Sequence, residues 1–336
     1  MREIAEHIIH ALNDGTDSVL VTVMKHRGSA PRHAGSQMLV DGSGLACGTI
    51  GGGAIEGHAI AEAQAMLGER HGQVEDLALK LQGKNSLGMA CGGDAVLLYT
   101  PVVAGDEQWG QVARGLVRCF EERVPAYLAL ACCEEAPAFE SSIALLDEAG
   151  ACMAGCCNVS KEQFGSLKLK GVCNGCYLMP IPLPTRAIVF GGGHVGRAAV
   201  AALSRVGFDC TLFECRPDFA RPEDVPAAKS IVLGSYESIA ASLSLDAHDY
   251  ALIMTNTHRY DYAVLSQVLR QPLAYVGMIG SRKKIALGRK LMLEEGISEE
   301  ALDAVHMPIG LDIKAETPEE IAVSIAAECI LHRATN

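Results

Sequence analysis

The chain has 336 residues, of which 49% are hydrophobic and 20% are charged. At about 100 to 200 residues per domain this length predicts two folded domains, and it excludes a peptide hormone, a single zinc finger and a coiled coil. Lys and Arg number 28 and Asp and Glu number 40, so the net charge is −12. A negative chain offers no general attraction to nucleic acid or to an anionic membrane, and we expect neither as a partner.

The N-terminus and the longest apolar runs favour a cytoplasmic protein. Residues 1–13 have the spacing of an amphipathic helix, without the apolar centre and cleavage site of a signal peptide. The apolar runs at 19–24 and 126–133 fall far short of the roughly 20 residues that span a bilayer. Because the 13 cysteines are odd in number and no export signal precedes them, free thiols, a metal or redox chemistry are favoured over disulfides.

The part of the chain before residue 180 mixes strands with helices. Asp41-Gly42-Ser43-Gly44 predicts a hairpin turn between two of the strands. We expect a mixed α/β domain over residues 1–179, whose topology the pattern leaves open. The predicted strands are 18–24, 37–40, 45–49, 94–101, 126–131 and 142–146, and the predicted helices are 54–67 and 108–122.

A proline at every second position of residues 180–184 predicts an extended linker between the domains. Beyond it, over residues 185–336, strands alternate with helices, which predicts a Rossmann-like, doubly wound parallel sheet. Thr317 and Glu320 have the spacing of a capping box at the start of the last helix. The predicted strands are 187–190, 210–214, 230–233, 250–255 and 273–278, and the helices between them are 194–205 and 260–270.

The strongest motif is the glycine turn Gly191-Gly192-Gly193-His194-Val195-Gly196, which follows a strand and opens a helix. In a Rossmann domain Gly191 permits the tight turn, Gly193 lets the backbone approach a pyrophosphate, and Gly196 allows close helix packing. The helix that begins at His194 supplies amide donors and the positive end of its dipole. The turn therefore predicts a dinucleotide site.

An acidic residue stands where such a site holds the ribose. Glu214 ends the second predicted strand, 23 residues after Gly191, and can accept hydrogen bonds from the ribose diol. An acid here favours NAD over NADP, although Arg216 is close enough to accept a 2′-phosphate. The alternative is a dinucleotide fold kept as a scaffold, since a fold does not determine its chemistry.

Two glycine-rich loops of the first domain are candidate phosphate sites. The first is Gly28-Ser29-Ala30-Pro31-Arg32, in which Arg32 adds a permanent charge. The second, residues 48–57, opens directly onto a helix. Exposed amides at a helix start stabilise an anion. A plain strand-to-helix turn explains the second loop equally well. We assign to cofactor binding Gly28, Arg32, Gly51, Gly52, Gly53 and Glu56.

Cys91 is the candidate reactive cysteine, which would handle sulfur or contact a metal. It precedes Gly92 and Gly93, which leave the thiol accessible, although a lone cysteine is more often a small buried residue. A separate group of cysteines includes a Cys-x-x-Cys pair and offers thiolates to zinc or an iron–sulfur cluster, but its spacing is irregular. That group is Cys152, Cys156, Cys157, Cys173 and Cys176.

Polar residues follow the last two predicted strands, at the sheet edge where open parallel sheets bind ligands. His258 and Asp261 come after one strand, and we expect them to be catalytic. Ser281 and Arg282 come after the next, and we expect them to bind a cofactor. The basic run 282–284 opposes the dipole of a helix that starts there, which calls for an anion.

Motifs of both domains occur as one ordered set. They are Gly28-Ser29-Ala30-Pro31-Arg32, residues 48–56, Cys91-Gly92-Gly93, the glycine turn, Thr257-His258, residues 280–284, Pro308-Ile309-Gly310-Leu311-Asp312-Ile313 and residues 317–322. Together they resemble the xanthine dehydrogenase accessory protein family, XdhC/CoxI, over both domains. The cysteines between Cys132 and Cys176 are a departure from that family's pattern.

The resemblance implies a chaperone more than a catalyst. Such a protein binds the molybdenum cofactor (molybdopterin), protects it while its terminal sulfido ligand is installed, and inserts it into a xanthine dehydrogenase-type molybdenum hydroxylase. The implied partners are that hydroxylase, a cysteine desulfurase and a second copy of the chain in a homodimer. The alternatives are an NAD-dependent oxidoreductase that uses the Rossmann domain, and a zinc or iron–sulfur protein.

Overall fold

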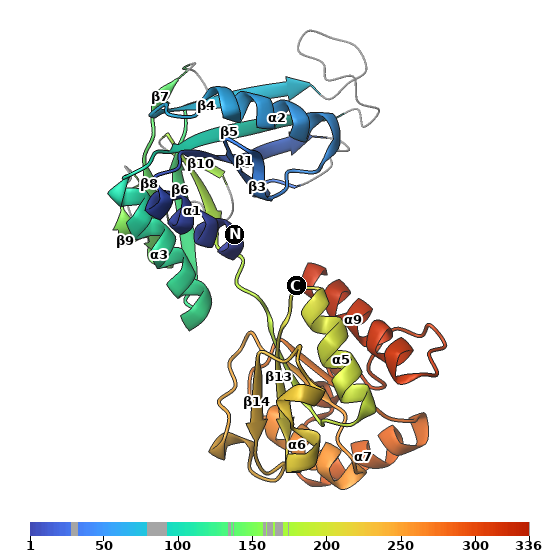
Figure 1. Ribbon diagram of the computed structural model, residues 1–336. Coiled ribbons are helices and arrows are strands. Elements are labelled where there is room, and N and C mark those ends of the chain that lie inside the picture. The colour runs from blue at the N-terminus through green and yellow to red at the C-terminus, as the bar shows by residue number, and fades with distance from the viewer. Residues whose placement is uncertain are drawn as a thin grey trace. The chain divides into compact units, whose positions relative to one another are not determined.

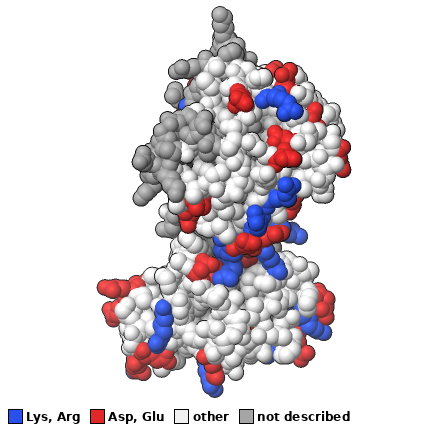
Figure 2. All heavy atoms as spheres, turned by 90° about the vertical axis from the view of Figure 1, so that its left-hand side faces the viewer, with Lys and Arg blue, Asp and Glu red and all other residues white. Residues whose placement is uncertain are grey.

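The computed structural model describes residues 1–27, 33–78, 93–133, 136, 138–156, 159, 164, 171–173 and 175–335. It divides into two units, Met1–Leu183 and Pro184–Asn336 (Figure 1). None of the helices in the described ranges is long and apolar enough to cross a membrane. On the face shown in Figure 2, basic side chains lie interspersed with acidic ones.

The first unit contains two sheets in which all the neighbouring strands run antiparallel. The predicted hairpin is confirmed, since Asp41 pairs with Gly44. One sheet has the order β3-β2-β1-β5-β4-β7, with β1 (Ser18–Arg27), β2 (Gln37–Asp41), β3 (Gly44–Gly48), β4 (His71–Ala78), β5 (Asp94–Val102) and β7 (Phe139–Glu140). The other has the order β10-β11-β6-β8-β9, with β6 (Ala126–Ala131), β8 (Ile143–Asp147), β9 (Cys152–Gly155), β10 (Gly171–Cys173) and β11 (Cys176–Pro180).

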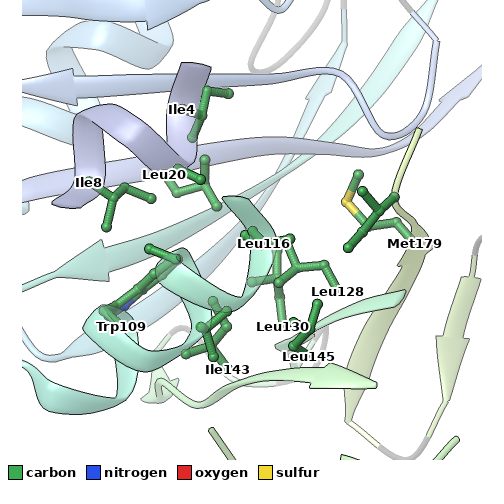
Figure 3. Packing of buried hydrophobic residues seen from close by; sticks show 14 of the residues in the cluster. Ile4, Ile8, Leu20, Trp109, Leu116, Leu128, Leu130, Ile143, Leu145 and Met179 are labelled. Carbon is green, nitrogen blue, oxygen red and sulfur yellow. The ribbon is translucent and has the colours of Figure 1, made fainter. Parts of the chain in front are cut away.

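Alternating side chains of β1 serve two separate cores. Val19 and Val21 lie in the cluster that packs against α2 (Gly53–Ala65). Leu20 points to the other face, where α1 (Arg2–Asp14) and α3 (Glu107–Glu122) pack. Leu20 shares that cluster with Leu128 and Leu145 of the second sheet, as Figure 3 shows. One hydrophobic core therefore joins both sheets, and the predicted mixed α/β fold of this part is confirmed.

The second unit is the doubly wound parallel sheet that the sequence predicts. Its order is β14-β13-β12-β15-β16, so the chain leaves β12 first to one side and later to the other. Hydrophobic clusters cover both faces of this sheet. The strands are β12 (Arg186–Phe190), β13 (Asp209–Glu214), β14 (Ser230–Leu233), β15 (Tyr250–Ile253) and β16 (Tyr275–Met278). One face is covered by α5 (His194–Arg205) and α9 (Pro318–Thr335), and the other by α6 (His258–Val268), α7 (Arg282–Glu294) and α8 (Glu299–Asp303).

Two helix starts show how local sequence sets the boundaries. The capping box is confirmed, because Glu320 N donates to Thr317 Oγ1 at 3.2 Å and Thr317 N donates to Glu320 Oε2 at 3.0 Å. Strand β15 stops at Ile253 and α6 starts at His258, so the predicted strand end at 255 and helix start at 260 were each two residues late. The reason is Thr257, whose side chain caps α6.

Replacing Gly196 by alanine should destabilise the second unit, because an added Cβ would lie 1.8 Å from the backbone oxygen of Gly191. We expect a loss of about 3 kcal/mol in the free energy of unfolding. The matched control is Gly193→Ala, whose Cβ would meet no atom within 4 Å. Urea denaturation of both variants checks this, and an equally small effect of the two would contradict the close packing of the turn.

Candidate functional site

The glycine turn after β12 is set mainly by packing within the protein. An added Cβ would lie 2.3 Å from a backbone oxygen at Gly191, 2.1 Å at Gly192 and 1.8 Å at Gly196. Gly191 also has a φ of +122°, which other residues rarely adopt. Gly193 differs, since a Cβ there would face open space. It is thus the glycine of this turn whose lack of a side chain leaves room for a ligand.

Glu214 is fully buried at the end of β13, and both of its oxygens are occupied. Oε2 accepts from Gly192 N at 2.7 Å and from Arg216 Nη2 at 3.0 Å. Oε1 accepts from Cys215 N at 2.9 Å, and from Arg216 N and Nε at 3.0 Å. The Arg216 guanidinium also lies 3.8 Å from the centre of the Phe219 ring. This carboxylate therefore ties the glycine turn to the segment after β13.

These contacts decide the pKa of Glu214. Burial alone would raise it, but hydrogen bonds from Arg216 and Gly192, together with the charge of Arg216, lower the pKa to about 2. The carboxylate is ionised at neutral pH, and its partners within the chain already satisfy it.

The glycine turn has room for the pyrophosphate of a bound NAD, but it does not have a free acceptor for the ribose. The open space at Gly193 and the start of α5 suit a pyrophosphate. A ribose diol needs a carboxylate oxygen to accept from it, and those of Glu214 are occupied by donors of the chain itself. The role of Glu214 in NAD binding stays a prediction that requires Arg216 to move away. His194 is exposed and lines a groove between α5 and α9.

Three of the predicted site residues come together in one cavity over the carboxyl ends of β15 and β16. His258, Asp261 and Ser281 all line this cavity, whose volume is about 1050 Å³. Lys284 of α7 lines it too, whereas the side chain of Arg282 lies outside the described part of the structure. Cavities that enclose small ligands are typically about 300 to 1,000 Å³. This is the sheet edge where open α/β folds bind their ligands.

His258 and Asp261 form a pair at the start of α6. Asp261 Oδ1 accepts from Thr255 N at 2.8 Å and from Thr255 Oγ1 at 2.7 Å, while Oδ2 lies 3.7 Å from His258 Nδ1. The Asp261 side chain is 6% exposed and that of His258 is 52% exposed. Burial raises the pKa of Asp261. The carboxylate fixes the loop after β15, and the imidazole remains accessible.

A segment that sequence reasoning did not assign to the site forms the opposite wall of the cavity. Residues 306–315, here called the strap, run alongside β16 and are held by α9. Gly310 N donates to Glu328 Oε2 at 2.6 Å, and Ser324 Oγ donates to the Leu311 carbonyl at 2.6 Å. Gly310 has a φ of +97°, so the Pro-Ile-Gly-Leu sequence was the signal of a tight turn here.

The loop after β3 in the first unit holds a carboxylate of the chain itself. Glu56 Oε2 accepts from Thr49 Oγ1 at 2.5 Å, from Ile50 N at 3.0 Å and from Gly52 N at 3.1 Å. Burial acts to raise the pKa of Glu56, but these hydrogen bonds outweigh it and lower the pKa. Phosphate binding by Gly51, Gly52 and Gly53 therefore stays a prediction, and it requires Glu56 to leave the loop.

Gly28, Arg32 and Cys91 lie outside the described residues, so their assignment to the site stays a prediction. The same holds for Cys157, one of the candidate metal ligands. Among the residues that are described, no group of three or more His, Cys, Asp and Glu side chains is placed to hold a metal ion.

Replacing Glu214 by glutamine should destabilise the second unit more at pH 7 than at pH 3. The folded-state pKa of about 2 is below the usual 4.5, so this stabilisation is complete above about pH 4.5 and is lost as the pH falls towards 2. The shift corresponds to about 3 kcal/mol at pH 7. Urea denaturation of wild type and variant at both pH values checks this. The control is Glu223→Gln at an exposed position, and a loss that does not shrink at pH 3 would refute the assignment.

Comparisons with known proteins agree on one family. The chain matches the model of the XdhC and CoxI family at residues 11–77, and that of the XdhC Rossmann domain at residues 187–329. It is 25% identical to the uncharacterized protein YqeB of Escherichia coli over 93% of the chain, but it spans only 42% of the length of YqeB. It is 24% identical to a probable subunit of xanthine dehydrogenase from Bacillus subtilis, covering 96% of this chain and 95% of that protein.

Two further likenesses span nearly the whole chain. It is 23% identical to the molybdenum cofactor insertion chaperone PaoD of Escherichia coli, covering 97% of this chain and 87% of PaoD. A crystal structure of a Bacillus halodurans protein named as a xanthine dehydrogenase has the same fold, with a TM-score of 0.83 at 22% identity, over 100% of this chain and 96% of that one. With both of its units matched, the chain belongs to the XdhC and CoxI family.

Proposed function

We propose that this protein is an accessory protein that binds the molybdenum cofactor and inserts it into a xanthine dehydrogenase-type molybdenum hydroxylase. The observation that carries the proposal is the similarity to PaoD, a molybdenum cofactor insertion chaperone, over 97% of this chain. The match extends through both units, so it does not rest on the common Rossmann fold alone.

The physical requirements of this cargo agree with the residues present. The cofactor is a phosphate-bearing anion, and a chain with a net charge of −12 must hold it at a local site. Its molybdenum suits sulfur ligation, for which Cys91 is the candidate, and Arg32 is one candidate partner of the phosphate, besides the site inferred below. The proposal includes a cysteine desulfurase that supplies the terminal sulfido ligand, a homodimer and a cytoplasmic location.

A second candidate function is an NAD-dependent oxidoreductase. It is favoured by the accessible His258 beside the buried Asp261, because a positioned imidazole is a common general base. The occupied carboxylate of Glu214 argues against it. Hydride transfer to NAD by the purified protein would support this second function over the first.

Cys91→Ser should cripple maturation of the client hydroxylase while the fold is kept. Serine nearly preserves the volume but replaces a soft, ionisable sulfur by a hard hydroxyl, so we expect the client's activity to fall about tenfold or more. The test is anaerobic co-expression with the client, followed by measurement of its activity, its cyanide-labile sulfur and the melting temperature of the accessory protein.

The matched control is Cys133→Ser, which changes a half-buried free cysteine outside the candidate metal group and should leave the client fully active. Cys91→Ala is a second variant in case serine disturbs the fold. A fully active, sulfurated client with both Cys91 variants would falsify the role of this thiol.

A further inference from the structure

We propose that the cavity between β15, β16 and the strap binds an organic phosphate, with the phosphate at Lys284 and a ring against the apolar wall. For the identity of the ligand as the molybdenum cofactor this inference rests on the proposed function. A free nucleotide has the same chemistry, and the experiment below separates the two sources.

One of the two lysines that line the cavity stands apart from its two aspartates in the described residues. Lys314 Nζ donates to Asp312 Oδ2 at 2.7 Å, so these two charges neutralise each other. Asp261 is turned to Thr255, which donates two hydrogen bonds to it. Within the part of the chain that the structure describes, the Lys284 ammonium group forms no ion pair. An anion in the cavity would give this exposed ammonium group an ion-pair partner.

The start of α7, which contains Lys284, also favours a bound anion. Its first turn contains no acidic residue, and Ser281 at the N-cap makes no side-chain hydrogen bond to the helix. Lys284 lies in this first turn, where its charge opposes the positive end of the helix dipole. A phosphate would offset this repulsion and accept hydrogen bonds that Ser281 leaves unused.

The apolar part of the remaining lining suits a flat, weakly polar group. Ile279, Ile309, Ile313 and Ile321 line the same cavity as Lys284. A phosphate alone would leave this apolar surface in contact with water, whereas a heterocyclic ring would cover it. The combination of a cation, hydroxyl groups and apolar side chains therefore indicates an organic phosphate rather than an inorganic anion.

The strap makes this cavity a formed site. Met278 N donates to the His306 carbonyl and Ile309 N donates to the Met278 carbonyl, each at 3.0 Å, so the strap extends the edge of β16. Glu328 then holds the turn at Gly310 from the other side. At the glycine turn, by contrast, the expected acceptor Glu214 is already occupied.

Titration calorimetry with AMP and with inorganic phosphate tests the site, using wild type, Lys284→Gln and Lys290→Gln. Lys290 is the matched control, because it lies on the same helix with its side chain 76% exposed and does not line the cavity. We expect wild type to bind AMP more tightly than phosphate. Lys284→Gln should weaken binding about tenfold, the effect of losing one charge-assisted hydrogen bond, and Lys290→Gln should not change it.

A second arm separates the cofactor from a nucleotide. After anaerobic co-expression with the cofactor pathway, the pterin retained by each purified variant is measured by its fluorescence after oxidation. Loss of pterin in Lys284→Gln identifies the cofactor as the ligand, and weaker AMP binding with unchanged pterin identifies a nucleotide.

Two results overturn the inference. One is that Lys284→Gln and wild type show the same AMP affinity and retain the same amount of pterin. A wild type that binds neither AMP nor pterin counts as this result. The other is that Gly193→Val abolishes binding while Lys284→Gln leaves it unchanged, which places the ligand at the glycine turn. Client activity is measured separately. If the proposed chaperone function proves wrong, the binding result can therefore still be interpreted.

Discussion

Tight turns leave backbone amides without partners, and in this protein carboxylates of the chain itself satisfy them. Glu56 accepts from the loop after β3, Glu214 from the glycine turn, Glu328 from the strap and Asp261 from the loop after β15. In each of these hydrogen bonds the acceptor is a carboxylate and the donor is a backbone amide. Hydrogen bonds to an ionised acceptor are stronger than those between two neutral groups. The shape of every candidate site described here depends on them.

Because of this arrangement, a glycine-rich loop in this protein does not by itself indicate a phosphate site. Such loops bind phosphate because their amides point to one place, but those amides serve a side-chain carboxylate equally well. At the loop after β3 Glu56 accepts from the amides that an anion would need, and at the glycine turn Glu214 accepts from the amide of Gly192. In the cavity over β15 and β16 the situation is reversed, since Lys284 lies there without a described acidic partner.

Local patterns predicted the elements well and the sites less well. Strands β6 and β14 and helix α5 have the predicted bounds, because each is a short apolar or amphipathic run between clear breaks. The two sheets of the first unit share a core that periodicity cannot reveal, since alternation tells which residues share a face and not what covers it. His258 and Asp261 were found by their place after a strand, and the basic run that includes Lys284 indicated an anion, but only the structure shows that Lys284 lines the same cavity as the other two.

The strap has a consequence for the thermodynamics of whatever enters the cavity. His306 packs its ring 4.5 Å from that of Tyr275 and accepts or donates a hydrogen bond with Glu328 at 2.8 Å, so the strap is fixed at its start as well as at Gly310. Its conformational entropy is already lost when the unit folds. A ligand therefore binds against a segment that is already ordered. Its binding free energy is not reduced by the cost of ordering a loop. Affinity at this wall should depend on fit and desolvation, with a small entropic penalty from the protein.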